Sequence, residues 1–154
     1  MKKITFLLPA NFRFVGIIFM LIGLIIGILR FYYGYKPEIL TLQTFAIYSS
    51  YLETKFMEVI GNNMGEELTG FFLLTGLFFL AFAREKIENE QTEKFRLRAF
   101  FLSAYANFLF ILVALFFTFG LGFIYMLMAS MGFGLLVYVI AFRFLVRFHR
   151  TNPE

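Results

Sequence analysis

Residues 99–142 read AFFLSAYANFLFILVALFFTFGLGFIYMLMASMGFGLLVYVIAF, and this stretch decides the fold. It holds 44 residues without a single charged side chain. One membrane-crossing helix needs about 20 mostly apolar residues, so the stretch is long enough for two crossings. Gly120-Leu121-Gly122 lies near its middle, and glycine tolerates the backbone angles of a tight turn. We therefore predict two membrane helices, over residues 94–119 and 123–147.

Two further uncharged runs, residues 14–29 and 68–83, lie earlier in the chain. Charged residues flank both runs, and long charged side chains at helix ends can extend to the lipid headgroups. With their flanks, the runs predict helices over residues 12–33 and 64–90. The expected fold is therefore an all-α membrane protein, a four-transmembrane-helix bundle forming a single membrane domain, 1–154.

The composition excludes several other classes of protein. Of the 154 residues, 60% are hydrophobic and 16% are charged, and the mean hydropathy is +0.79. Soluble domains are roughly 45–50% apolar and about 25% charged. A soluble domain of this length could not bury the apolar excess, which includes 25 Phe. We therefore exclude a soluble domain and a nucleic-acid partner, although the pI is near 9.4.

The basic residues are distributed unevenly between the two sides that four crossings create. Both termini and the loop between the second and third helices carry eleven basic and five acidic residues, a net charge of +6. The opposite side carries three basic and five acidic residues, a net charge of −2. Cytoplasmic loops are enriched in Lys and Arg. We expect a bacterial inner-membrane protein with both termini cytoplasmic, facing anionic lipid headgroups.

The outer segment, residues 34–63, allows two interpretations over residues 38–60. Ile39–Tyr48 is rich in β-branched and aromatic residues and could pair with Phe56–Ile60 as a short hairpin. A three-to-four-residue spacing of apolar side chains from Leu42 to Val59 instead suits an amphipathic helix lying on the membrane. We favour the extended hairpin.

The loop between the second and third predicted helices has a helical charge pattern. Opposite charges stand four residues apart, a spacing that stabilises helices, in the pairs Arg84/Glu88, Lys86/Glu90 and Glu90/Lys94. We predict a cytoplasmic helical extension across this region, with a solvated charged face.

Small and weakly polar residues mark where the membrane helices should pack. Small residues let helix backbones approach closely, and buried polar side chains hydrogen-bond between helices. The predicted packing positions are Gly16, Gly23, Gly27, Ser103, Asn107, Ser130 and Gly134. The basic residues near the cytoplasmic helix ends should contact lipid headgroups or a partner, and these are Lys94, Arg96, Arg98, Arg143, Arg147 and Arg150.

Chemically active residues are scarce. The chain has no Cys and a single His, which excludes disulfides, thiolate metal sites and bis-histidine haem ligation within one chain. The predicted span interiors contain no ionisable residue, although proton and ion pathways depend on such groups. We predict no enzymatic activity, no catalytic residues, no metal and no cofactor.

Two stretches give the chain a resemblance to a known group of proteins. They are Asn62–Leu68 (NNMGEEL) and Phe82–Glu90 (FAREKIENE), the latter continuing into Arg96-Leu97-Arg98. In these the chain resembles small four-span inner-membrane proteins of Bacteroidota, often encoded near helix-turn-helix regulators. The resemblance implies four helices and an inner-membrane location, and it brings no activity or functional residues with it.

The sequence leaves two functional hypotheses. The first is a non-catalytic polytopic membrane protein acting by interaction, an accessory or regulatory subunit of a membrane complex, with a protein partner or a homo-oligomer. The second is a small oligomeric channel or transporter whose polar path is assembled from several copies, using Ser103, Asn107 and Thr118.

Overall fold

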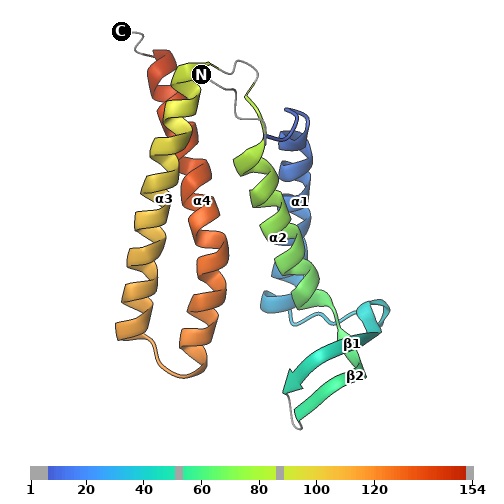
Figure 1. Cartoon of the computed structure of the whole chain (residues 1–154). Helices are drawn as coiled ribbons and strands as arrows, with labels where there is room; N and C mark the ends of the chain where they lie inside the picture. The colour runs from blue at the N-terminus through green and yellow to red at the C-terminus, as the bar shows by residue number, and fades with distance from the viewer. Residues whose placement is uncertain (1–6, 51–53, 86–88, 152–154) are drawn as a thin grey trace. The chain divides into compact units, whose positions relative to one another are not determined.

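A computed structural model describes residues 7–50, 54–85 and 89–151 (Figure 1). Four helices are long and apolar enough to cross a membrane, as predicted. Their bounds are α1 Phe12–Gly27, extended by a π-helical turn Ile28–Tyr32, then α2 Gly65–Phe82, α3 Glu90–Phe117 and α4 Leu121–Thr151. The chain divides into two compact units, residues 1–20 with 73–154 and residues 21–72.

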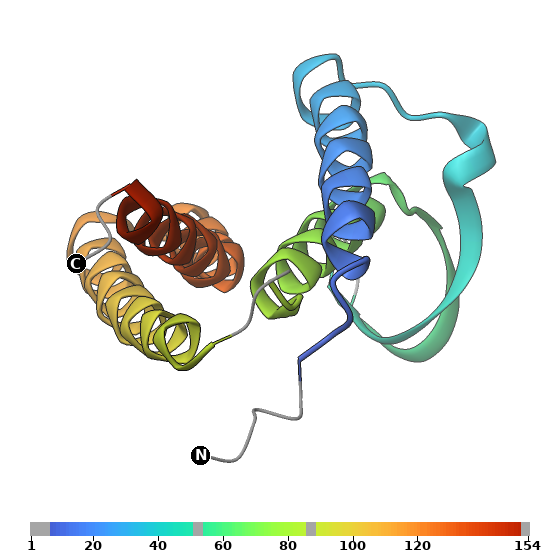
Figure 2. The same cartoon turned by 90° about the horizontal axis from the view of Figure 1, so that it is seen from above.

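Helices α3 and α4 form an antiparallel pair and lie side by side in both views (Figures 1 and 2). Gly120, with a φ of +62°, supplies the turn between them, because glycine adopts this left-handed conformation without steric cost. The predicted turn is thus present, although α4 begins at Leu121 rather than at residue 123. The core of this unit contains Ala81, Ala99, Tyr138, Ala141 and Phe142.

The outer segment is an antiparallel hairpin, which confirms the favoured interpretation over the amphipathic helix. Strands β1 Thr41–Ser50 and β2 Thr54–Asn63 pair from Thr41 opposite Asn63 to Ser50 opposite Thr54. A short 3-10 turn, Glu38–Leu40, precedes β1. The small sheet qualifies the all-α prediction, and its β-branched and aromatic residues suit a pleated surface.

The predicted helix over residues 64–90 is wrong at its C-terminal end. Helix α2 ends at Phe82, and Ala83 forms a parallel bridge with Leu8. The backbone of Leu8 donates to Phe82 O at 3.0 Å and accepts from Arg84 N at 2.9 Å. These two bonds take the place of helical hydrogen bonds. The backbone of Leu8 satisfies Phe82 O and Arg84 N, which another turn of α2 would otherwise have paired.

Helix α3 begins at Glu90, four residues before the predicted start. Asn89 is its N-cap, and the Asn89 side chain accepts from Thr92 N at 2.9 Å. Such a cap satisfies one of the backbone N–H groups that a helix start leaves unpaired. The predicted extension is therefore helical only from Glu90, and residues 86–88 of the charge pattern lie outside the described residues.

Helices α1 and α2 approach closely at two glycines, Gly16 and Gly76. A Cβ atom on Gly16 would lie 2.9 Å from Gly76 O, and one on Gly76 would lie 2.8 Å from Met20 N. Real Cβ atoms do not approach backbone atoms this closely, so any side chain here would force the helices apart. The spacing of small residues along a single helix did not predict Gly76, because its contact is with Gly16 on another helix.

Gly76→Ala should therefore weaken the folded state. The added methyl meets backbone that cannot rotate away, and overpacking typically costs about 1–3 kcal/mol. Thermal unfolding in detergent measures the effect. Gly70→Ala is the matched control, since it lies on the same helix with open space around its Cα. Equal melting temperatures for the two variants would contradict a tight Gly16–Gly76 crossing.

Candidate functional site

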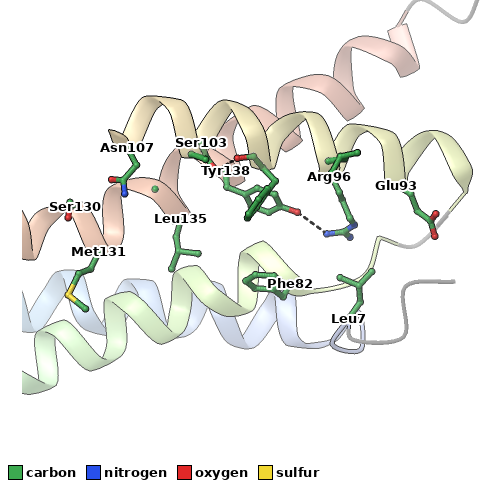
Figure 3. Close-up of a pocket in the computed structure, with 14 residues that line it drawn as sticks. Leu7, Phe82, Glu93, Arg96, Ser103, Asn107, Ser130, Met131, Leu135 and Tyr138 are labelled. Carbon is green, nitrogen blue, oxygen red and sulfur yellow. Dashed lines mark hydrogen bonds between the residues drawn. The ribbon is translucent and has the colours of Figure 1, made fainter. Parts of the chain in front are cut away.

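The side chain of Arg96, in α3, is buried at the C-terminal end of α2 and is only 5% exposed as a residue. Its guanidinium donates to Ala83 O at 3.0 Å and to Ala81 O at 3.2 Å. It also donates to the Tyr138 hydroxyl of α4 at 3.5 Å (Figure 3), and its Cζ lies 4.5 Å from the centre of the Phe142 ring. Carbonyls at a helix end lack helical partners and carry partial negative charge. Arg96 therefore joins α2, α3 and α4.

Glu85 is the second buried ionised group at this end of the helices, and its side chain is 7% exposed. Its Oε1 accepts from Arg13, at the start of α1, and from Arg143 of α4 at 3.1 Å. Glu85 directly follows the extended segment after α2. One carboxylate oxygen thus connects three separate parts of the chain through charge-assisted hydrogen bonds, which are stronger than neutral ones.

The pKa of Glu85 is below its usual value. Burial alone would raise it, because an ionised carboxylate is costly away from water. The Arg13 hydrogen bond and the positive charges of Arg13, Arg143 and Arg96 together outweigh burial and lower the pKa. Glu85 is therefore ionised at neutral pH and balances part of the surrounding positive charge.

A groove along α3 and α4, which Phe82 of α2 and Leu7 also line, begins beside Arg96 and has a volume of about 670 Å³ (Figure 3); we call it the α3/α4 groove. Its walls are mainly apolar, with Leu97 and Phe100 from α3 and Leu135 from α4. Glu93 lies at one end, and Asn107 at the other. Binding sites for small molecules are concave and mostly apolar, with a few polar groups, and typically measure about 300–1,000 Å³. The groove has these properties.

The hairpin presents an exposed apolar face. Phe45, Ile47 and Val59 share one face of the two strands, since alternate residues point the same way and Phe45 pairs with Val59. Their exposed fractions are 63%, 71% and 58%. On the other face, the Asn62 amide donates to Glu67 of α2 at 2.6 Å. This bond connects the opposite face of the hairpin to α2.

The predicted packing residues occupy different environments. Gly16 lies at the close crossing with Gly76, Gly23 is buried, and a Cβ on Gly27 would meet the Thr69 side chain at 3.0 Å. On the α3/α4 pair, a Cβ on Gly134 would lie 3.4 Å from Cγ of Asn107.

The polar packing residues do not form the interhelical hydrogen bonds that their positions suggested. The hydroxyls of Ser103 and Ser130 donate within their own helices, to Phe100 O at 2.8 Å and Leu127 O at 2.6 Å. Asn107 Oδ1 is buried and has no hydrogen-bond partner among the described residues.

The basic residues predicted to contact headgroups divide into two groups. Arg96 corrects that prediction, because it is buried and donates to two carbonyls at the end of α2 and to the Tyr138 hydroxyl of α4. Arg143 is partly exposed and binds Glu85. Lys94, Arg98 and Arg147 are exposed, as a headgroup contact requires, and the side chain of Arg150 lies outside the described part of the chain.

The side chains that the sequence analysis missed are Glu85, Arg13 and Tyr138. Glu85 lies in a charged loop and Arg13 beside an uncharged run of the sequence, and neither position indicates burial. Asn89 carried a usable signal, because Asn is a preferred N-cap directly before the first residue of a helix and therefore indicates a new helix start at Glu90.

Comparisons with protein-family models, with curated proteins and with solved structures found no match. The resemblance to four-span proteins of Bacteroidota therefore stays a prediction. Among the described residues, no group of three or more His, Cys, Asp or Glu could hold a metal ion.

Glu85→Gln should destabilise the protein at neutral pH by about 3 kcal/mol, because removing one member of a buried ion pair leaves charge uncompensated. In the wild type, the lowered pKa gives a stabilisation that is complete above the unfolded value of about 4.3 and is lost as the pH falls through the native value. The variant should lose less stability on acidification below pH ~4.3. Melting temperatures across pH measure both effects, with exposed Glu90→Gln as control. Identical acid sensitivity of wild type and Glu85→Gln would contradict this role.

Proposed function

We propose that this chain is a non-catalytic polytopic membrane protein that acts by contact, as an accessory or regulatory subunit of a bacterial inner-membrane complex. The observation that carries the proposal is the exposed face of the hairpin formed by Phe45, Ile47 and Val59. An isolated two-stranded hairpin is marginally stable in water, and an apolar face next to unpaired strand edges is a surface suited to a partner protein or a second copy.

The charged groups support the same proposal. Arg96 donates to two carbonyls at the end of α2, and Glu85 accepts from Arg143 of α4. Their charges therefore act in holding the helices together. The hydroxyls of Ser103 and Thr118 donate to carbonyls of their own helix, at 2.8 and 2.6 Å. A channel assembled from several copies would need the Ser103 and Thr118 hydroxyls to face a pore. Because both hydroxyls bond within their own helix, binding to another protein is the better-supported function.

The orientation belongs to the same proposal. With both termini in the cytoplasm, as the excess of basic residues there favours, the hairpin lies on the outer side of the membrane. A partner would therefore contact the chain through an extracytoplasmic surface, while the exposed basic residues Lys94, Arg98 and Arg147 face anionic lipid.

Purification from native membranes in mild detergent tests the proposal. The wild type should retain one partner at fixed stoichiometry or form a homo-oligomer. Phe45→Ser/Val59→Ser should lose that assembly without a fall in melting temperature, because both side chains are exposed in the single chain.

The matched control is Leu42→Ser/Tyr48→Ser, on the opposite face of β1, which should keep the assembly. A wild type that purifies as a partnerless monomer, or an assembly that the Phe45/Val59 variant keeps, would overturn the proposal.

A further inference from the structure

The α3/α4 groove has the length of one leaflet of a bilayer. Glu93 lines one end and Asn107 lies near the other, both on α3. The fourteen steps from residue 93 to residue 107 rise by ~21 Å at the usual helical rise per residue. Half of a bilayer, headgroups included, measures about 20–22 Å. A phospholipid lying along α3 would therefore extend from one end of the groove to the other.

The walls of the groove suit an acyl chain. Leu97, Phe100 and Leu135 lie between its two ends, and Met131 of α4 lines it while remaining 66% exposed. The groove lies on a helix pair that is apolar enough to cross the membrane. Lipid chains are the apolar molecules that surround such helices.

The end near Arg96 determines which headgroup fits. Arg96 already donates to two carbonyls and to Tyr138. Glu93 lines the same end (Figure 3), and its carboxylate forms no ion pair or hydrogen bond with another of the described residues. A carboxylate without a partner favours a ligand that brings a positive charge with N–H donors.

We propose that the groove binds one ethanolamine phospholipid, with its ammonium group at Glu93 and one acyl chain along Leu97, Phe100 and Leu135. A choline headgroup carries the same charge but has no N–H to donate, and a glycerol headgroup brings no cation to the carboxylate. The site is thus selective for the ammonium headgroup, and it is independent of the contact face on the hairpin.

Native mass spectrometry of the purified protein tests the selectivity. The added probes are phosphatidylethanolamine, phosphatidylcholine and phosphatidylglycerol with identical acyl chains. Phosphatidylethanolamine should bind about tenfold more tightly than either other lipid, the effect of one hydrogen bond between charged groups. Glu93→Gln should remove this preference, and Glu90→Gln, an exposed residue outside the groove, should keep it.

A second pair of variants tests the position of the acyl chain. Met131→Trp fills the groove and should weaken binding of all three lipids by at least about tenfold, the effect of losing one well-buried apolar contact. Met128→Trp, on the same helix at 65% exposure and outside the groove, should bind as the wild type does. Equal binding of the three lipids, a preference for phosphatidylglycerol, or an unchanged preference in Glu93→Gln would overturn the proposal.

Discussion

The hydrogen bonds that the Arg96 guanidinium donates are the interaction on which the rest of the helical unit depends. Helix α2 ends at Phe82, well before the start of α3, and leaves carbonyls without helical partners. Arg96 binds Ala81 O and Ala83 O, contacts the Tyr138 hydroxyl, and lies over the Phe142 ring. A buried cation is tolerated only when its donors are satisfied. Because the helix end supplies those acceptors, the same bonds fix where α2 meets α3 and α4.

The small core of the protein follows from this arrangement. In lipid, outward-facing apolar side chains need no burial, so helix association depends on close packing and hydrogen bonds rather than on a large hydrophobic core. Ala81 and Ala99 sit beside Arg96, and Gly16 meets Gly76 at the neighbouring crossing. Glu85 adds a charged connection between α1 and α4. The buried polar groups act in assembly, and the hairpin face and the α3/α4 groove are the surfaces that we propose for binding other molecules.

The sequence predicts the number of helices, because apolar runs and flanking charges report directly on membrane crossing. It also predicts the hairpin, from β-branched and aromatic residues. It fails between Phe82 and Glu90, where local charge spacing favours a continuous helix and the deciding contact comes from distant Leu8. The burial of Arg96 and Glu85 was not predicted for a similar reason, since burial near a helix end depends on other helices. Gly76 was missed because its partner, Gly16, lies on another helix.

The melting temperature of Arg96→Lys, compared with that of Arg98→Lys, tests the central claim that a buried arginine joins these helices. Lysine keeps the charge but lacks the planar fork that reaches several acceptors at once. We predict that Arg96→Lys loses about 1.5–3 kcal/mol of stability, whereas exposed Arg98→Lys stays within about 0.5 kcal/mol of wild type. Equal stability of the two variants would show that Arg96 is an ordinary interfacial charge, and would contradict the account.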